Sequence, residues 1–280
     1  MMLPSGEARR AQPHLGTIVE IWAKGPDADT AVKAAFGEIS EVHRLMSFHS
    51  AGSDVARINR ADAANAVQVD RRTYEVLAFA RQLSEWSEGV FDITVGGALV
   101  AAGFLPTSTR LASDDTDYRD LVLLPDAQVM LKKPALIDCG GIAKGYAVDL
   151  ALARLQDCGM ESGLVNAGGD LRFFGEPQTV HVRHPYASRL LQLEPMMNKA
   201  VASSSGFYGQ GGNDVDPLVD PRSGKCKKWM CGVTVIAPSC MAADALTKVV
   251  RLYRGPVANL LEKLAAQALI IDEHDVRLAC

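Results

Sequence analysis

The sequence lacks any long hydrophobic run. No window reaches the roughly 18 apolar residues that a membrane-spanning helix needs. The first seventeen residues contain no apolar stretch long enough for a signal peptide, and the residues after Arg9-Arg10 do not continue a twin-arginine signal. We therefore expect a cytoplasmic protein without a membrane segment.

Clustered basic residues and paired cysteines are also scarce. The net charge is −4, and one short basic patch, 225–228, stands where a nucleic-acid-binding surface would need a longer stripe of Lys and Arg. The six cysteines form no CxxC pair and no Cys–His cluster with zinc spacing. We expect no nucleic-acid partner and reduced, mostly buried thiols, with Cys139 as a small core residue.

The composition is that of a globular protein. Of 280 residues, 48% are apolar and 22% are charged, and no internal repeat or low-complexity linker divides the chain. Expected strands and helices mix without a steady β–α–β rhythm, which favours an α+β or mixed α/β fold over a doubly wound sheet. We expect a flexible tail over residues 1–12 and one compact domain of mixed sheets with flanking helices over residues 13–280.

Hydrophobic periodicity predicts the main elements. Alternation predicts a strand at 17–23, and helical spacing predicts helices at 29–46, 71–86 and 143–157. The remaining expected elements are a hairpin of 121–124 with 129–131, strands at 135–137, 232–237 and 268–271, and helices at 242–252 and 257–265.

A glycine-rich turn between a strand and a helix carries the first chemical signal. It reads Asp138-Cys139-Gly140-Gly141-Ile142-Ala143-Lys144-Gly145. Paired glycines allow positive φ and close approach of a ligand, and the following helix offers N–H groups and a positive dipole to an anion. The spacing fits neither a Rossmann turn nor a P-loop. With Gly168-Gly169-Asp170 after the next strand, it predicts a site for a phosphate-bearing nucleotide.

A second signal lies in the helix expected near the C-terminus. Asp244 and Thr247 are one helical turn apart and share a face. Carboxylate, hydroxyl and backbone carbonyl oxygens suit Mg²⁺, a cation that commonly also binds substrate phosphate.

These segments, in order, resemble one family of enzymes. The matching motifs are GTIVEIW, MSFHSAGSDVARINR, GVFDITVGG, DCGGIAKGYAVD, GLVNAGGDLRFFG, VASSSGFY, VDPRSG and VTVIAPSCMAADALTK. They are similar to those of the ApbE family, the FAD:protein FMN transferases, and the similarity runs from about Leu15 to Asp272. The resemblance implies an α+β fold, FAD as substrate, Mg²⁺ as cofactor, AMP as product, and a target flavoprotein that receives FMN on a Thr or Ser hydroxyl.

The resemblance also implies the site residues. The positions matched to FAD contacts are Leu15, Phe48, Val90, Phe91, Asp92, Asp138, Lys144 and Val219. The positions matched to the metal are the backbone carbonyl of Gly141 and the side chains of Asp244 and Thr247.

Two positions depart from the family pattern. Pro217 stands where the family usually has a His regarded as the base, which leaves Asp216 and Asp220 as catalytic candidates and His184 as a histidine to test. Lys248 stands where a Thr usually follows the metal-binding Asp by four residues. Three hypotheses stay open: an active transferase, an FAD-binding member with weak or no transfer activity, and a structural or partner-binding protein without flavin. The sequence leaves the oligomeric state open.

Overall fold

The chain forms two compact units. The computed structural model describes residues 6–107, 113, 115–205, 218–226, 231–253, 257–273 and 275–279. The first unit comprises residues 1–43, 144–205 and 230–280, and the second comprises 44–143 and 206–229. None of the helices in these described ranges is long and apolar enough to cross a membrane.

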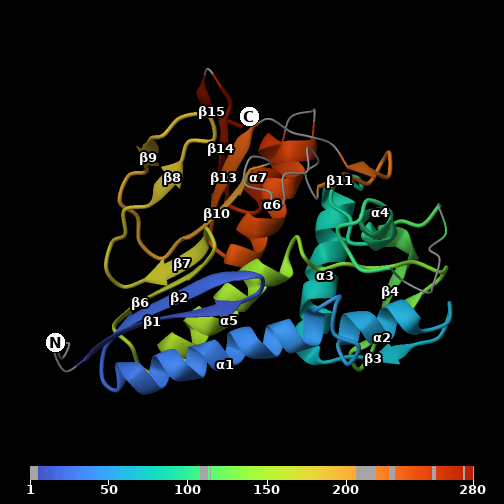
Figure 1. Cartoon of the computed structure of the whole chain (residues 1–280), viewed down its shortest axis with the longest axis horizontal. Coiled ribbons are helices and arrows are strands. Elements are labelled where there is room, and N and C mark those ends of the chain that lie inside the picture. The colour runs from blue at the N-terminus through green and yellow to red at the C-terminus, as the bar shows by residue number, and fades with distance from the viewer. Residues whose placement is uncertain are drawn as a thin grey trace. The chain divides into compact units, whose positions relative to one another are not determined.

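The first unit is built on an eight-stranded sheet in the order β1-β2-β6-β7-β10-β13-β14-β15, with every neighbouring pair antiparallel (Figure 1). The strands are β1 (Glu7–His14), β2 (Thr17–Lys24), β6 (Ser162–Ala167), β7 (Asp170–Phe174), β10 (Ala200–Ser205), β13 (Gly232–Ala237), β14 (Gln267–Ile271) and β15 (Val276–Leu278). A separate hairpin joins β8 (His181–Arg183) to β9 (Leu190–Gln192).

Helices bury their apolar stripes in the first unit. They are α1 (Ala28–Met46, of which 28–43 belong to this unit), α5 (Ala143–Asp157, of which 144–157 do), α6 (Cys240–Leu252) and α7 (Ala258–Lys263). Helix α6 packs on β10 and β13, while α5 meets β6 where Leu155 lies against Gly163. Arg154 of α5 forms an ion pair with Glu38 of α1. The core between sheet and helices is aliphatic, as the amphipathic sequences require.

The second unit contains shorter elements. They are α2 (Asp54–Arg60), β3 (Val67–Gln68), α3 (Arg71–Trp86), α4 (Gly96–Ala101), a 3₁₀ turn (Tyr118–Asp120), β4 (Leu121–Leu124), β5 (Gln128–Leu131), β11 (Val219–Asp220) and β12 (Lys225–Cys226). Strands β3, β5 and β4 form one small sheet, and β11 and β12 form another. Asp70 caps α3 by accepting the Arg72 N–H, as expected of a short acidic side chain at an N-cap.

The predicted elements with strong periodicity are confirmed. Helices 71–86 and 143–157 and strand 232–237 have the expected bounds, and the other predicted helices and the 121–131 hairpin agree within two residues at each end. The α+β class is confirmed as well, because the large sheet is antiparallel throughout.

The expected flexible tail is wrong for residues 7–12. Residues from Glu7 onward form β1, which pairs with β2 along its whole length. The strand escaped prediction because only Ala8 is buried and the alternation of apolar and polar residues is missing. Its neighbours hold it in place instead, since Trp22 donates to Glu7 at 2.5 Å and Arg9 pairs with Glu20. The boundary of a single domain at 13–280 stays a prediction.

The expected strand at 135–137 is also wrong. The segment is extended, but it forms only an isolated parallel bridge, between Leu136 and Val95. The side-chain amide of Asn59 takes up both the N–H and the carbonyl of Ile137, at 2.8 and 2.9 Å. A side chain thus satisfies the groups that a neighbouring strand would otherwise bond.

Candidate functional site

In the first unit, α5 and α6 approach each other closely at Gly145. A Cβ placed on Gly145 would lie 2.3 Å from the carbonyl oxygen of Cys240 and 2.8 Å from Cβ of Asp244. The Gly145 N–H donates to Asp244 Oδ2 at 3.1 Å, and Asp149 of α5 accepts the Cys240 and Met241 N–H groups at the start of α6. These contacts fix where Asp244 stands.

Lys144 links the two glycine motifs that the sequence separates. Its ammonium pairs with Asp170 of the second motif, whose side chain is only 2% exposed. Burial lowers the pKa of Lys144, nearby Asp244 raises it, and Lys248 lowers it again. Asp170 was not among the predicted site residues, although it ends the second glycine motif.

Asp244 is fully buried and both of its carboxylate oxygens have hydrogen-bond donors. Oδ2 accepts the Gly145 N–H, and Oδ1 pairs with the ammonium of Lys248 on the next turn of α6. Lys248 also donates to the Asp244 carbonyl at 3.0 Å, and the Thr247 hydroxyl donates to the same carbonyl at 2.7 Å. The predicted metal residues Asp244 and Thr247 therefore share a face as expected, together with a lysine.

The glycines of the two motifs have different roles. Gly168 and Gly169 have φ of 65° and 102°, and a Cβ on Gly168 would lie 2.4 Å from the Thr17 hydroxyl. Gly140 is not among the residues with positive φ, so it does not use the backbone freedom that glycine allows. In that motif the close approach occurs at Gly145 and involves a helix rather than a turn.

In the second unit, the GVFDITVGG and DCGG motifs run side by side. Asp138 donates its N–H to Ile93 at 2.8 Å, and Gly96 donates to Leu136 at 2.9 Å. A Cβ on Gly96 would lie 2.5 Å from the Leu136 carbonyl oxygen, so the contact requires glycine. These two hydrogen bonds join segments about forty residues apart in the sequence, at the isolated bridge between Val95 and Leu136.

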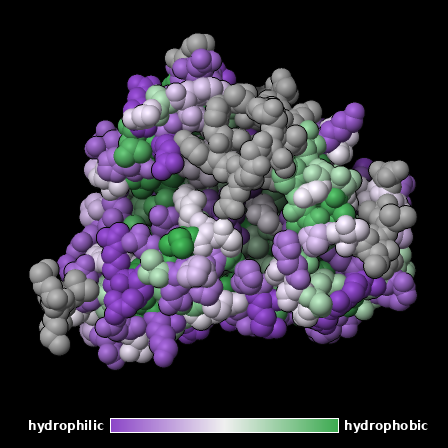
Figure 2. All heavy atoms as spheres, viewed as in Figure 1, coloured by the Kyte–Doolittle hydropathy of each residue, from purple (hydrophilic) through white to green (hydrophobic). Residues whose placement is uncertain are grey.

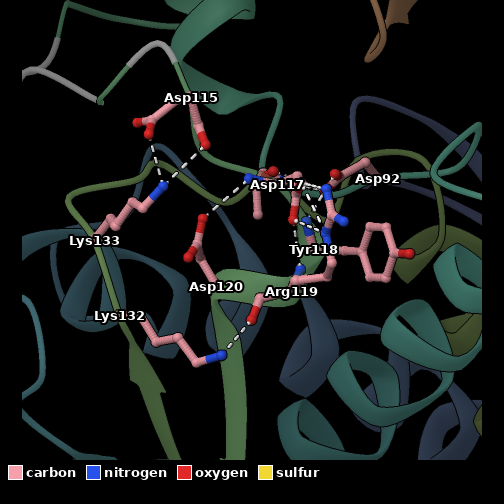
Figure 3. A network of polar contacts seen from close by, with 9 residues as sticks. Asp92, Asp115, Asp117, Tyr118, Arg119, Asp120, Lys132 and Lys133 are labelled. Carbon is pink, nitrogen blue, oxygen red and sulfur yellow. Dashed lines mark hydrogen bonds and ion pairs between the residues drawn. The ribbon is translucent and has the colours of Figure 1, made fainter.

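Asp92 lies just before these paired residues and accepts several local hydrogen bonds. Its Oδ1 accepts both the N–H and the hydroxyl of Thr94 at 2.8 Å, and its Oδ2 accepts the Tyr118 N–H at 2.9 Å (Figure 3). Burial raises the pKa of the Asp92 carboxyl, while the bonds from Thr94 and Tyr118 lower it. Figure 3 also shows ion pairs near Tyr118. In one of them Lys133 Nζ lies 2.7 Å from Asp115 Oδ2.

A cavity of about 730 Å³ opens beside Asp92. Figure 2 shows pale and green, mainly uncharged residues gathered over α4, which forms one wall. Its lining residues are Asp92, Thr94, Val95, Gly97, Ala98, Val100, Ala101, Thr107, Ser113, Thr116, Leu136, Val219, Pro221, Arg222, Ser223 and Gly224. The size and the mainly small, apolar lining with a few polar groups are typical of a small-molecule site.

The cavity joins two of the predicted FAD positions, Asp92 and Val219. Among the other positions predicted in this unit, Val90 and Phe91 are buried, and Phe48 is half-buried and packs edge-on against His49. None of these three lines the cavity.

The remaining predicted positions are Asp138 and Leu15. Asp138 accepts the Gly140 N–H at 3.0 Å, and burial raises the pKa of its carboxyl. Leu15 lies in the first unit, in the two-residue turn between β1 and β2, with φ of 54° before Gly16 at 72°. This turn places a leucine in a backbone conformation that normally favours Asn or Gly.

One catalytic candidate, Asp220, is the last residue of β11, just before the turn to β12. Its carboxylate accepts from the Arg222 guanidinium at 3.0 Å and is 4% exposed. This contact shapes the VDPRSG turn that forms one side of the cavity. The other candidate, Asp216, and the neighbouring Pro217 lie outside the described residues.

His184 and the cysteines have structural surroundings. His184 is buried after β8 and accepts the Tyr186 N–H on Nδ1 at 3.2 Å. Burial raises the pKa of the Cys139 and Cys240 thiols, so neither is a thiolate nucleophile at neutral pH. The prediction of Cys139 as a small core residue is confirmed, because it is fully buried.

Several organising residues carried no usable signal in the sequence. Asn59 and Asp149 bind backbone groups of segments about 80 and 90 residues away. Such contacts depend on the folded arrangement, and neither residue lies in a recognisable pattern. Thr94, by contrast, belongs to a motif already singled out and follows Asp92 at the spacing of a local side-chain turn.

The architecture defines the class of protein. The fold is that of a crystal structure of an ApbE protein from Thermotoga maritima, with a TM-score of 0.86 and 27% identity, covering 98% of this chain and 97% of that one. A flavin transferase ApbE structure from Vibrio cholerae has the same fold, with a TM-score of 0.83, 24% identity, and coverage of 99% and 98%.

Residues 15–270 match the model of the ApbE family, and the chain therefore belongs to that family. A curated FAD:protein FMN transferase of Vibrio cholerae is 28% identical over 269 residues, covering 87% of this chain and 80% of that protein. One of Rhodobacter capsulatus is 27% identical over 255 residues and covers 82% of this chain, which spans about half (48%) of that relative.

Proposed function

We propose that this protein transfers the FMN half of FAD to a Thr or Ser hydroxyl of an acceptor flavoprotein and releases AMP. The observation that carries the proposal is the cavity lined by both Asp92 and Val219, two positions that the family resemblance assigns to flavin contacts. Relatives at 27–28% identity are named FAD:protein FMN transferases.

The reaction is a phosphoryl transfer. The acceptor oxygen attacks the phosphorus of the FMN half, the bond from that phosphorus to the oxygen of AMP breaks, and the hydroxyl proton passes to a base. The ammonium of Lys144 is suited to stabilise charge that develops on the phosphoryl oxygens. Asp216 and Asp220 remain the candidate bases, and Asp220 would have to act from beside Arg222.

The residues proposed for Mg²⁺ fit it poorly in their present arrangement. Asp244 presents no unoccupied carboxylate oxygen, because Lys248 and the Gly145 N–H take one each. An ammonium beside a dication is unfavourable. When bound, a divalent ion would supply positive charge next to the phosphates.

The ion pair between Lys248 and Asp244 favours a second function. If Lys248 holds Asp244 permanently and Pro217 leaves no histidine base, the protein binds FAD but transfers FMN slowly or not at all. Loss of one general base typically reduces a rate by about 10² to 10⁴. The two functions predict the same binding and different chemistry.

Two further parts of the proposal concern the setting of the reaction. The acceptor is a flavoprotein with a small Gly-Ala-Thr-type target motif. The place of the reaction is the cytoplasm.

The experiment combines binding with transfer. Titration of FAD with the purified protein should quench flavin fluorescence. Incubation with FAD, Mg²⁺ and an acceptor should leave a UV-fluorescent acceptor band on a denaturing gel. Asp92→Ala should weaken both signals, and Asp157→Ala, at an exposed position at the end of α5, serves as a control. Quenching without a fluorescent band would favour the second function, and absence of both would contradict flavin binding.

A further inference from the structure

Lys248 and Asp244 form an ion pair within one helix, at the position where the resemblance places a metal. They are four residues apart on α6, and the Asp244 side chain has no exposed area. Lys248 donates to both the carboxylate and the main-chain carbonyl of Asp244. The ammonium thus binds two oxygens of Asp244, the residue that the resemblance matches to a metal ligand.

The surrounding charges balance without any added ion. Lys144 pairs with Asp170 and Lys248 pairs with Asp244, and Lys144 is directly followed by Gly145, whose N–H donates to Asp244. With an uncharged residue at 248, the group would carry a net negative charge and attract a cation. The ammonium of Lys248, which is part of the chain, supplies this positive charge.

We propose that Lys248 is a built-in cation that takes, on Asp244, the place a divalent ion would occupy. This inference deepens the proposed function, since it concerns the same site and rests on that site being the one that handles FAD. It assigns to Lys248 a positioning role: the lysine keeps the buried Asp244 neutralised and weakens the binding of Mg²⁺ to the chain.

The proposal has a consequence for folding. Removing Lys248 leaves a fully buried carboxylate without its cation, which is strongly unfavourable. A dication can then bind where the ammonium was and restore the balance. Stability of the variant should therefore depend on Mg²⁺, whereas stability of the unmodified protein should not.

The test measures melting temperature and Mg²⁺ affinity by calorimetry, without FAD or acceptor, for the unmodified protein and Lys248→Thr. The unmodified protein should melt at the same temperature in EDTA and in Mg²⁺. Lys248→Thr should melt lower in EDTA, recover in Mg²⁺, and bind the ion at least about tenfold more tightly. Lys133→Thr is the matched control, because it also removes a lysine from an Asp pair, in the second unit. It should leave Mg²⁺ affinity unchanged.

Two results would overturn the proposal. One is Mg²⁺ binding by the unmodified protein as tight as by Lys248→Thr. The other is a folded Lys248→Thr that gains no affinity. Should Lys248→Thr fail to fold in either buffer, Lys248→Met keeps much of the apolar stem, and the same titration of it decides.

A transfer assay keeps this inference apart from the proposed function. If the unmodified protein never modifies an acceptor, the proposed function fails while the metal titration still decides the role of Lys248. If transfer occurs, it should persist in EDTA, and transfer abolished by EDTA would contradict the built-in cation.

Discussion

The two units carry candidate site residues of different character. In the first unit, the charged groups form ion pairs within the protein: Lys144 pairs with Asp170, and Lys248 pairs with Asp244. In the second, Asp92 is tied to local backbone and hydroxyl groups and stands at the wall of an open cavity.

The two units differ in how their charged groups are held. Buried ion pairs fix side-chain positions and depend strongly on both partners. The cavity in the second unit is lined mainly by small residues and hydroxyls, and the charged residues Asp92 and Arg222 also line it. Four variants test this difference between the two units.

The largest effect is expected at Lys144. Lys144→Ala leaves the nearly buried Asp170 carboxylate without its ammonium and should lower the free energy of unfolding by about 3 kcal/mol. Urea denaturation measures the loss, and adding Asp170→Asn should recover part of it. Lys133→Ala, which breaks an exposed pair in the second unit, should change little. Equal losses for the two lysine variants would remove the contrast between the units.

The next effect tests the close approach of α5 and α6. Gly145→Ala forces a Cβ to within 2.3 Å of the Cys240 carbonyl and should cost about 1–3 kcal/mol. Gly37→Ala is the control within α1, because a Cβ there meets nothing within 4 Å. It should stabilise by about 0.5–1 kcal/mol. Chemical denaturation of both variants decides, and a neutral Gly145→Ala would contradict the packing.

The pH dependence of Asp92 tests the second unit. Burial raises its pKa above the unfolded value, so the folded chain holds the proton more readily between those two values. The contribution of Asp92 to stability therefore falls as pH rises through this window and is larger below it. Denaturation of the unmodified protein and Asp92→Asn across pH 3.5 to 7 should show a stability difference, unmodified protein minus variant, that decreases as pH rises. A difference that grows with pH would refute the assignment.

The smallest effect is expected in the β1–β2 turn. Leu15→Asn places Asn-Gly, the preferred pair for this turn, where both residues have positive φ. We expect a gain of about 0.5–1 kcal/mol in unfolding free energy, with weaker FAD binding if Leu15 contacts the flavin. Thermal melting and FAD fluorescence measure the two sides, and a loss of stability would show that the turn is not strained.

Local patterns predicted the elements that depend on local physics. Helix α5 and helix α3 followed from apolar spacing and terminal signals. Strand β1 did not, because its stability comes from pairing with β2 rather than from its own alternation. The segment before Asp138 looked like a strand by composition, yet the side chain of Asn59 takes the backbone hydrogen bonds of Ile137.

The site shows the same division. Regular helical spacing placed Asp244 and Thr247 on one face, and the family resemblance marked Lys248 as a departure. The sequence could not show that Lys248 bonds Asp244, nor that Lys144 pairs with Asp170, since both depend on burial and on side-chain orientation in the folded chain. The sequence could not predict the cavity beside Asp92 either, because residues from segments far apart in the sequence line it.

The mass of an acceptor protein tests the central claim most directly. An acceptor with a Thr target, incubated with FAD and this protein, should gain the mass of FMN less one water, with one AMP released for each acceptor modified. Replacing the target Thr by Val should abolish both signals. An unchanged acceptor mass, measured where FAD binding has been demonstrated, would contradict the proposed transfer.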